Sequence, residues 1–170
     1  MSLALRPVTE ADLPVVEQLT FDPAAAGEFE YFGWFDQRLW RRRFAENGLI
    51  SPDGGVLMVV DDAERLGFVS WRRHSAGVSA HSFELGIALL PGARGQGHGT
   101  LAHLLLARYL FAHTPVHRIF ASTDVLNIAE QRALEKAGFS REGVARGAAW
   151  RDGAWRDAVM YSLLRTDPPA

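Results

Sequence analysis

The 170-residue sequence contains no cysteine, which excludes disulfide bonds, thiolate nucleophiles and cysteine metal sites. It also lacks any apolar run long enough to span a bilayer, and its first ten residues lack the apolar core of a signal peptide. The net charge of −2 gives no positive field that would attract nucleic acid or an anionic membrane. We therefore expect a cytoplasmic protein that binds neither nucleic acid nor membrane and holds no metal.

The composition is that of a globular protein, with 48 % hydrophobic and 22 % charged residues. A chain of this length can bury one sizeable core. We expect a single domain over residues 1–165, followed by a flexible tail over residues 166–170 that contains two prolines.

The hydrophobic pattern predicts a mixed α/β (α+β) fold. A helix should follow Thr9, and a second should occupy the later half of the aromatic-rich stretch 21–40. Two more helices are expected over residues 97–113 and from Asn127 to Gly138. Apolar alternation and turn signals predict strands over residues 3–8, 56–60, 66–72, 81–90, 117–124, 139–150 and 154–164.

The most informative segment runs from Leu85 to Ala102, where a strand enters a glycine-rich loop that leads into a helix. Glycines let backbone N–H groups approach a ligand closely, and a helix N-terminus favours an anion. A phosphate or pyrophosphate is the natural ligand. A nucleotide P-loop is excluded, because His98 and Gly99 stand where that motif needs its lysine and its hydroxyl residue.

A dinucleotide-binding Rossmann motif is a second interpretation. The stretch 97–102 fits G-x-G-x-x-A, and Asp124 follows at the end of the next strand. However, the six residues from Pro91 to Gln96 separate the strand from these glycines, where that motif needs a tight turn. The chain also ends in a hairpin signal, Asp152-Gly153, and does not continue in βαβ units.

The third interpretation is an acyl-CoA loop. The stretch 94–99, RGQGHG, fits R/Q-x-x-G-x-G/A, the signature of the GNAT acetyltransferase superfamily, and Pro91 precedes it by three residues. Asn127 begins the next helix and Gly138-Phe139 ends it, as in the second cofactor motif of that superfamily. The C-terminal stretch 138–164 is similar to the branch that acetylates ribosomal-protein N-termini and many small amines (RimJ/RimL-like).

This resemblance implies the GNAT fold, a mostly antiparallel central sheet with splayed central strands and flanking helices. Acetyl-CoA would be the co-substrate, with its pantetheine in the gap between strands 81–90 and 117–124 and its pyrophosphate on the glycine loop. The residues that the resemblance assigns to acetyl-CoA are Ile87, Leu89, Leu90, Arg94, Gly95, Gln96, Gly97, His98, Gly99, Thr100 and Asn127.

The implied reaction transfers the acetyl group to a primary amine by direct attack in a ternary complex. Glu84, on the strand that enters the glycine loop, is the candidate base, with an ion pair as its alternative role; His81 is the second candidate. Tyr161 is the candidate acid. The sequence departs from its relatives where they carry other proton donors, because Leu134 and Glu130 occupy those positions.

The acceptor would be a protein N-terminus or a small-molecule amine. The resemblance places it near Phe32, Trp34, Phe35 and Glu84, because aromatic and acidic side chains suit a cationic amine. The protein would act as a monomer or a homodimer. A non-catalytic acyl-CoA sensor and a Rossmann-type oxidoreductase are the alternatives.

Overall fold

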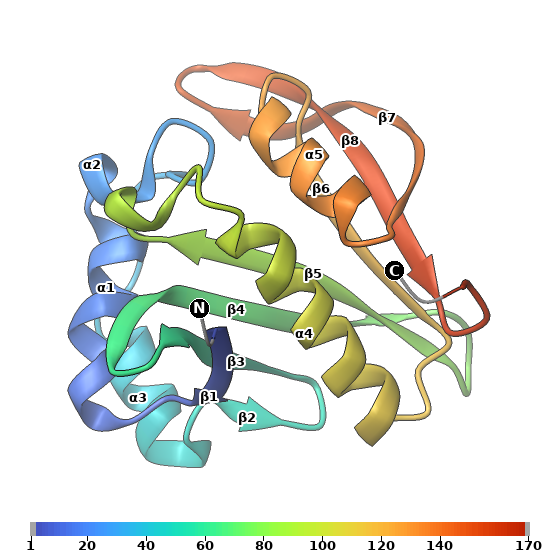
Figure 1. Ribbon diagram of the computed structural model, residues 1–170. Helices are drawn as coiled ribbons and strands as arrows, with labels where there is room; N and C mark the ends of the chain where they lie inside the picture. Colours follow the sequence, from blue (N-terminus) through green and yellow to red (C-terminus); the bar gives the residue numbers. More distant parts are fainter. Residues whose placement is uncertain (1–2, 169–170) are drawn as a thin grey trace.

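The computed structural model describes residues 3–168, and in it one eight-stranded sheet carries helices on both faces (Figure 1). Residues 169 and 170, which belong to the expected tail, lie outside the described residues. The strands are β1 (Leu3–Pro7), β2 (Ile50–Ser51), β3 (Gly54–Asp61), β4 (Glu64–Ser75), β5 (His81–Leu89), β6 (Arg118–Asp124), β7 (Ser140–Arg151) and β8 (Ala154–Leu164). The α-helices are α1 (Leu13–Phe21), α2 (Pro23–Ala26), α3 (Leu39–Asn47), α4 (His98–His113) and α5 (Ile128–Lys136), and 3-10 turns lie at η1 (Glu10–Asp12) and η2 (Pro91–Ala93).

The strand order is β1-β3-β4-β5-β6-β8-β7, with β2 paired to β3. Neighbouring strands are antiparallel except β5 and β6, which are parallel. This order confirms the predicted GNAT-type sheet. The Rossmann interpretation is wrong, because that fold requires consecutive parallel strands joined by helices.

The parallel pair β5–β6 is the weak seam of the sheet. These strands pair only at Phe83 with Ile119 and at Glu84 with Phe120, whereas β5 stays paired to β4 as far as Leu89. Beyond Glu84 the two strands diverge, and the two parts of the sheet form a V that opens toward the glycine loop (Figure 1). The sequence predicted this splay through its family resemblance.

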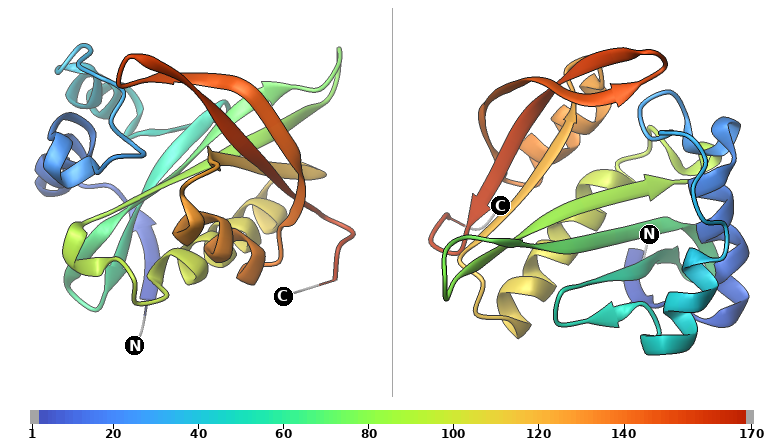
Figure 2. Two further views of the ribbon diagram at one scale, coloured as in Figure 1. Left: turned by 90° about the horizontal axis from the view of Figure 1, so that it is seen from above. Right: turned by 180° about the vertical axis from the view of Figure 1, so that it is seen from behind.

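Two hydrophobic cores hold the layers together, one on each face. Strand β3 is buried on both faces, so its side chains alternate between the cores: Leu57 and Val59 face α4, while Val56, Met58 and Val60 face α1 and α3. The continuous apolar run of β3 follows from this double burial. Figure 2 shows the sheet from above and from behind, with α1 and α3 on the side away from α4.

The aromatic stretch 21–40 departs from the expectation. A helix was predicted in its later half, but the chain forms the short α2 and then irregular backbone up to Arg38. Gly27 and Gly33 adopt φ angles of 85° and 98° there, which helical residues do not adopt.

Among the described residues, no helix is both long and apolar enough to cross a membrane.

The turn Asp152-Gly153 connects β7 to β8, and both of its residues have positive φ, as a type I′ turn requires. Strand β7 lies at the end of the strand order. Its pairing with β8 shifts register twice, between Arg141 and Gly143 and between Ala145 and Ala149. The hairpin is therefore bent and irregular along its outer strand.

A buried carboxylate ties the N-terminal elements together. Asp12 is fully buried; its two oxygens accept from the guanidinium of Arg6 at 2.6 and 2.9 Å and from Nε of Arg65 at 2.5 Å. Thr9 adds bonds from its backbone N–H and its hydroxyl at 2.8 and 2.7 Å. The bonds from Arg6, together with those from Arg65 and Thr9, outweigh burial and hold the pKa of Asp12 far below its usual range.

We expect Asp12→Asn to lower the free energy of unfolding by about 2 kcal/mol at pH 7, because the buried side chain loses the charge that accepts hydrogen bonds from two partly exposed guanidinium groups. Denaturant unfolding measures this loss. A lowered carboxylate pKa stabilises the fold above the unfolded pKa of 3.8, and this stabilisation disappears as the pH falls. The difference between the two proteins should therefore shrink in acid, and an equal difference at pH 7 and pH 2 would contradict the assignment.

Candidate active site

The first cavity lies at the open end of the V and has a volume of about 780 Å³. Its walls come from four segments: the loop after α2, the free end of β5, the glycine loop with the start of α4, and one side of α5. Its lining includes Glu30, Ile87, Leu89, Arg94, Gly95, Gly97, Gly99, Thr100, Asn127, Glu130, Arg132 and Lys136.

The glycine loop presents backbone to this cavity. Gly95 and Gly97 adopt φ angles of 73° and 85°, and Gly97 is the N-cap of α4. A Cβ built on either residue would meet no atom within 4 Å, so the space above this backbone is open. The first-turn amides of α4 have no partner within the helix and favour an anion. The loop therefore leaves room for a pyrophosphate, and its binding there stays a prediction.

The side chains around this loop serve the fold. Arg94 donates from Nε to the Leu89 carbonyl at 2.9 Å and from Nη2 to the carbonyls of Ala25 and Ala26, which ties α2 to β5. Its guanidinium donors, expected to contact phosphate, are thus directed at carbonyl oxygens. Gln96 likewise donates to the Gly92 carbonyl at 2.6 Å.

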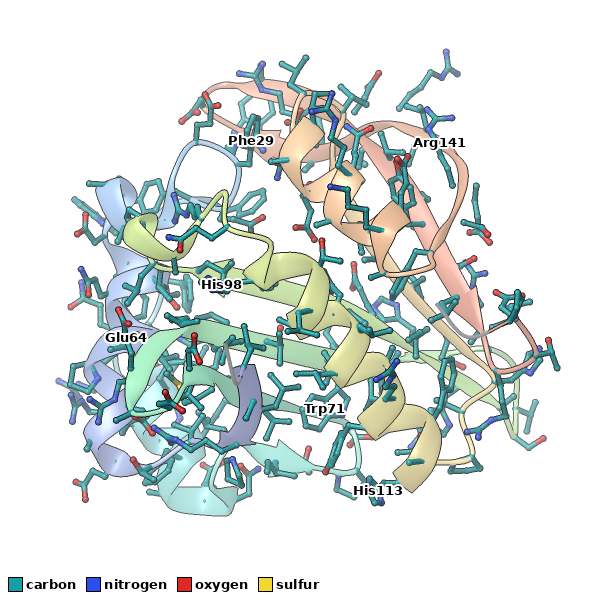
Figure 3. All side chains as sticks on the ribbon, viewed as in Figure 1. Phe29, Glu64, Trp71, His98, His113 and Arg141 are labelled. Carbon is teal, nitrogen blue, oxygen red and sulfur yellow. The ribbon has the colours of Figure 1, made fainter. Side chains whose placement is uncertain are left out.

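Two further residues assigned to acetyl-CoA turn away from the first cavity. His98 is buried at the start of α4, with Nδ1 3.0 Å from the Ala93 carbonyl (Figure 3). Leu90 packs into the core beneath α1 and α3. Neither lines the first cavity, so any contribution of His98 to ligand binding is left to its backbone.

Asn127 caps α5, and its contact with acetyl-CoA stays a prediction. Its Oδ1 accepts from the backbone N–H of Glu130 at 3.3 Å, which caps α5, and its Nδ2 donates to the Thr123 hydroxyl at 3.0 Å. It also lines the first cavity. Arg132 and Lys136 bring positive charge to the same wall. Sequence reasoning missed these two, although they lie five and nine residues after the capping Asn127, and that spacing could have indicated a common side of α5.

The second cavity lies across the sheet and has a volume of about 570 Å³; a smaller third cavity of about 230 Å³ adjoins α1 and α3. Phe29 and Glu30 line the first and second cavities, so the loop after α2 borders both. Figure 3 shows Phe29 on this loop at the open end of the V. Glu30 also lines the third cavity, so the three cavities meet at this loop.

The aromatic residues expected to bind the acceptor are only partly gathered here. Phe32 lines the second and third cavities and Phe35 lines the third. Trp34 is 79 % exposed and lines none of the three. Trp40 lines the second and third cavities, and its Nε1 donates to the Thr20 hydroxyl at 3.0 Å.

Glu84 lies where β5 and β6 part, and it lines the second cavity. Its carboxylate accepts from the Arg72 guanidinium, lies 2.8 Å from Nε2 of His74 and accepts from the Ser122 hydroxyl at 3.4 Å. Burial alone would raise the pKa of Glu84, but Arg72 and His74 outweigh it and lower the pKa. A carboxylate with a lowered pKa accepts protons poorly, so the structure favours the ion-pair role over the base role.

Tyr161 is fully buried between β8 and α5, and its hydroxyl donates to Glu135 at 2.9 Å. It lines none of the three cavities, so the structure does not bring this candidate acid to the site. Burial and the bond to Glu135 raise its pKa. His81 also lies outside the cavities, with its ring edge against Phe83. Leu134 is buried as well, so proton donation from its position is excluded.

Glu30 is a site residue that sequence reasoning missed. It is the carboxylate common to all three cavities. The residue is partly exposed, but the surrounding cavity walls desolvate its carboxylate; this desolvation and the negative charge of Glu130 raise its pKa to about 7, while Arg151 and Arg94 act in the opposite direction. The acidic character of its segment was visible in the sequence, but the sequence could not show which acid reaches the junction.

This arrangement combines an anion-binding loop, an unpaired strand edge and a second cavity beyond the point where β5 and β6 part. The sequence also matches the family model described as the acetyltransferase (GNAT) domain over residues 2–140. The chain belongs to the GNAT acetyltransferase family. As a member it is an N-acetyltransferase whose co-substrate is acetyl-CoA.

Among the described residues, no group of three or more histidine, aspartate or glutamate side chains could hold a metal ion.

Solved structures share the fold of this acetyltransferase. A RimL ribosomal L7/L12 alpha-N-protein acetyltransferase in complex with coenzyme A has a TM-score of 0.79 at 19 % identity, covering 96 % of this chain and 94 % of its own. A spermidine N-acetyltransferase from Vibrio cholerae with CoA and spermine has a TM-score of 0.78 at 20 % identity, covering 97 % and 96 %. A putative acetyltransferase from T. thermophilus is 29 % identical, with a TM-score of 0.71 and coverage of 98 % and 88 %. A search of curated protein sequences finds no significant match.

We expect Glu84→Gln to lower the stability of the acetyltransferase at pH 7 while turnover of the folded protein stays nearly normal, because the carboxylate is held by Arg72 and His74. The lowered pKa stabilises the fold above the unfolded pKa of 4.5, so the difference in melting temperature should shrink as the pH falls. Melting temperature and rate are measured on the same sample. A loss of two or more orders of magnitude in rate, roughly the contribution of a positioned base, at unchanged stability would restore Glu84 as the proton acceptor.

Proposed function

We propose that this chain acetylates the α-amine of a peptide or protein N-terminus by direct attack on acetyl-CoA in a ternary complex. The observation that carries the proposal is the junction of the cavities at Phe29 and Glu30. Acetyl-CoA in the first cavity and an amine entering from the second would meet at this junction. No covalent acetyl-enzyme is needed, because the two substrates can react directly.

The fit of acetyl-CoA rests on three features of the first cavity. The amides at the start of α4 face open space above Gly95 and Gly97 and suit the pyrophosphate. The side of β5 from Gly86 to Leu89 that faces the gap is not paired to β6, so pantetheine can lie along it as an added strand. Arg132 and Lys136 supply positive charge for a further phosphate.

The acceptor class follows from the charges around the second cavity. Its walls hold four arginines, namely Arg43, Arg72, Arg151 and Arg156, and five carboxylates, namely Glu30, Asp53, Glu84, Asp124 and Asp157. Two of these arginines, Arg72 and Arg151, pair with Glu84 and Asp124. A polyamine carries only positive charge, so it could use the carboxylates of this cavity but would leave the four guanidinium groups there without a ligand partner. A peptide presents one ammonium group together with carbonyl and acidic groups that arginines can bind, which supports a peptide acceptor.

We expect Gly97→Ala to weaken binding of acetyl-CoA at least tenfold, because a Cβ would occupy the space above the loop. Gly48→Ala is the matched control: Gly48 also has a positive φ and an open Cβ position, but it ends α3 outside the three cavities. Both variants should lose about 1–2 kcal/mol of stability through backbone strain. Calorimetric titration separates them, and equal affinities would place the pyrophosphate elsewhere.

We expect peptides with a free α-amine to release thiol from acetyl-CoA at least tenfold faster than spermidine at equal concentration. An acidic residue early in the peptide should increase the rate, because Arg43 and Arg156 line the second cavity and neither forms an ion pair within 4 Å among residues 3–168. The measurement follows free thiol, with N-acetylated peptides as the control. A preference for spermidine would overturn the acceptor class, and binding of acetyl-CoA without turnover on any amine would identify a non-catalytic sensor.

A further inference from the structure

We infer that Glu30, on the loop after α2, is the residue that takes the proton from the acceptor amine. This inference rests on the proposed function, since it presupposes that amine and thioester meet at the junction. Its first support is position: the residue is common to the first, second and third cavities, so its carboxylate borders both substrate spaces. Glu84, by comparison, lines only the second.

The carboxylate of Glu30 is also free to react. Among residues 3–168 no side chain donates a hydrogen bond to it and no cation forms an ion pair with it within 4 Å. The cavity walls surround its carboxylate and withdraw water from it, but part of the residue stays exposed, so a proton that it accepts can pass on to water. Glu84, in contrast, is occupied by Arg72, His74 and Ser122. A proton acceptor needs an available lone pair within reach of the amine.

The loop that carries Glu30 is held in place from the far half of the sheet. Arg151, at the end of β7, is buried and forms an ion pair with Asp124 at 2.5 Å. Its guanidinium lies over the rings of Phe29 and Phe32, at 5.5 and 5.9 Å from their centroids, and donates to the Phe29 carbonyl at 3.3 Å. Arg151 thereby connects this loop to β7 across the mouth of the V and fixes the backbone next to Glu30.

The charged groups around Glu30 set the pH at which it works. Glu130 faces it from α5 and raises its pKa together with burial, whereas Arg151 from β7 and Arg94 from the glycine loop lower it. The second cavity adds further charges from α3, β4, β5, β6 and β8: Arg43, Arg72, Glu84, Asp124, Arg156 and Asp157. The resulting pKa of about 7 suits an acid–base group that works near neutral pH.

The proton balance of the step is complete. The ammonium group of the acceptor gives one proton to the Glu30 carboxylate, and the freed lone pair forms the N–C bond to the thioester carbonyl. The C–S bond then breaks with its electron pair on sulfur, and the second N–H proton passes to that thiolate. One proton per turnover leaves Glu30 for solvent, so the products are the amide, coenzyme A and a proton.

The test compares pH–rate profiles between pH 5.5 and 9.5 for the wild-type protein and for Glu30→Gln, Glu30→Asp and Glu130→Gln. We expect Glu30→Gln to lower kcat by about two to three orders of magnitude and to remove the rising limb near pH 7. Glu30→Asp should retain that limb with a reduced rate. Glu130→Gln should move the limb to lower pH, because it removes a negative charge that raises the pKa of Glu30. Glu64→Gln, outside all three cavities, is the control.

Three results would overturn the assignment: kcat of Glu30→Gln within threefold of the wild type, an unchanged limb, or an increase in KM alone. The last would show that Glu30 binds the ammonium group without accepting its proton. The acceptor amine itself ionises near pH 8 in every variant. A limb that all variants share at that pH therefore belongs to the amine. Acetyl-CoA must stabilise each variant against heat as it does the wild type, which shows that the variant is folded.

A second readout does not depend on the acceptor. The pKa of Glu30 is raised above its unfolded value of 4.5, so the wild type should lose stability relative to Glu30→Gln as the pH rises from 4.5 to 7, and no further above that. A constant stability difference over this range would overturn the raised pKa. The expected stability change without turnover of any peptide would leave the environment of Glu30 intact and reject the proposed acceptor.

Discussion

The structure depends on the short pairing between β5 and β6. Parallel strands normally share a ladder along their whole length, but here the ladder stops after Phe83 and Glu84. Backbone groups beyond this point are left facing a gap, and buried backbone polar groups need hydrogen-bond partners. The protein can satisfy only part of this need itself, as when Arg94 donates to the Leu89 carbonyl. The first cavity follows the free end of β5, so these backbone groups are open to an extended amide-containing ligand.

A sheet that opens in this way must be held together elsewhere. At the closed end, Glu84 connects β4 to β6 through Arg72 and Ser122. At the open end, Arg151 reaches from β7 to the loop after α2. These two contacts lie on either side of the junction between the cavities. The contacts that hold the open sheet together therefore place charged groups beside the cavities, and one of these groups, Arg151, acts on the pKa of Glu30.

Much of this arrangement could be predicted from the sequence. The double burial of β3, the glycine loop before α4 and the Asn127 cap are local patterns, and their periodicity or spacing survives in the fold. The acid–base residues could not be found in the same way. Tyr161 and Glu84 looked suitable because of their strand positions, but the partners of a side chain depend on contacts such as Arg151 with Phe29, which are 122 residues apart in sequence.

Stretch 21–40 shows the same limit. Its aromatic and acidic residues predicted a helix, whereas tertiary contacts hold most of it in irregular backbone around the cavities. Propensity is a weak guide where a loop packs against distant elements. Phe29, Glu30 and Phe32, which line the cavities, lie on this loop, since a loop can place side chains at a junction that regular strands and helices do not reach.

The irregular outer strand of the terminal hairpin has a consequence for the behaviour of the protein at high concentration. A sheet edge with straight, regular backbone can recruit the edge of another molecule and start aggregation. The two register shifts along β7 interrupt its hydrogen-bonding pattern and bend it, so a second molecule cannot pair along its full length. Removing these bulges to straighten the hairpin would improve its pairing with β8 and at the same time create an adhesive edge.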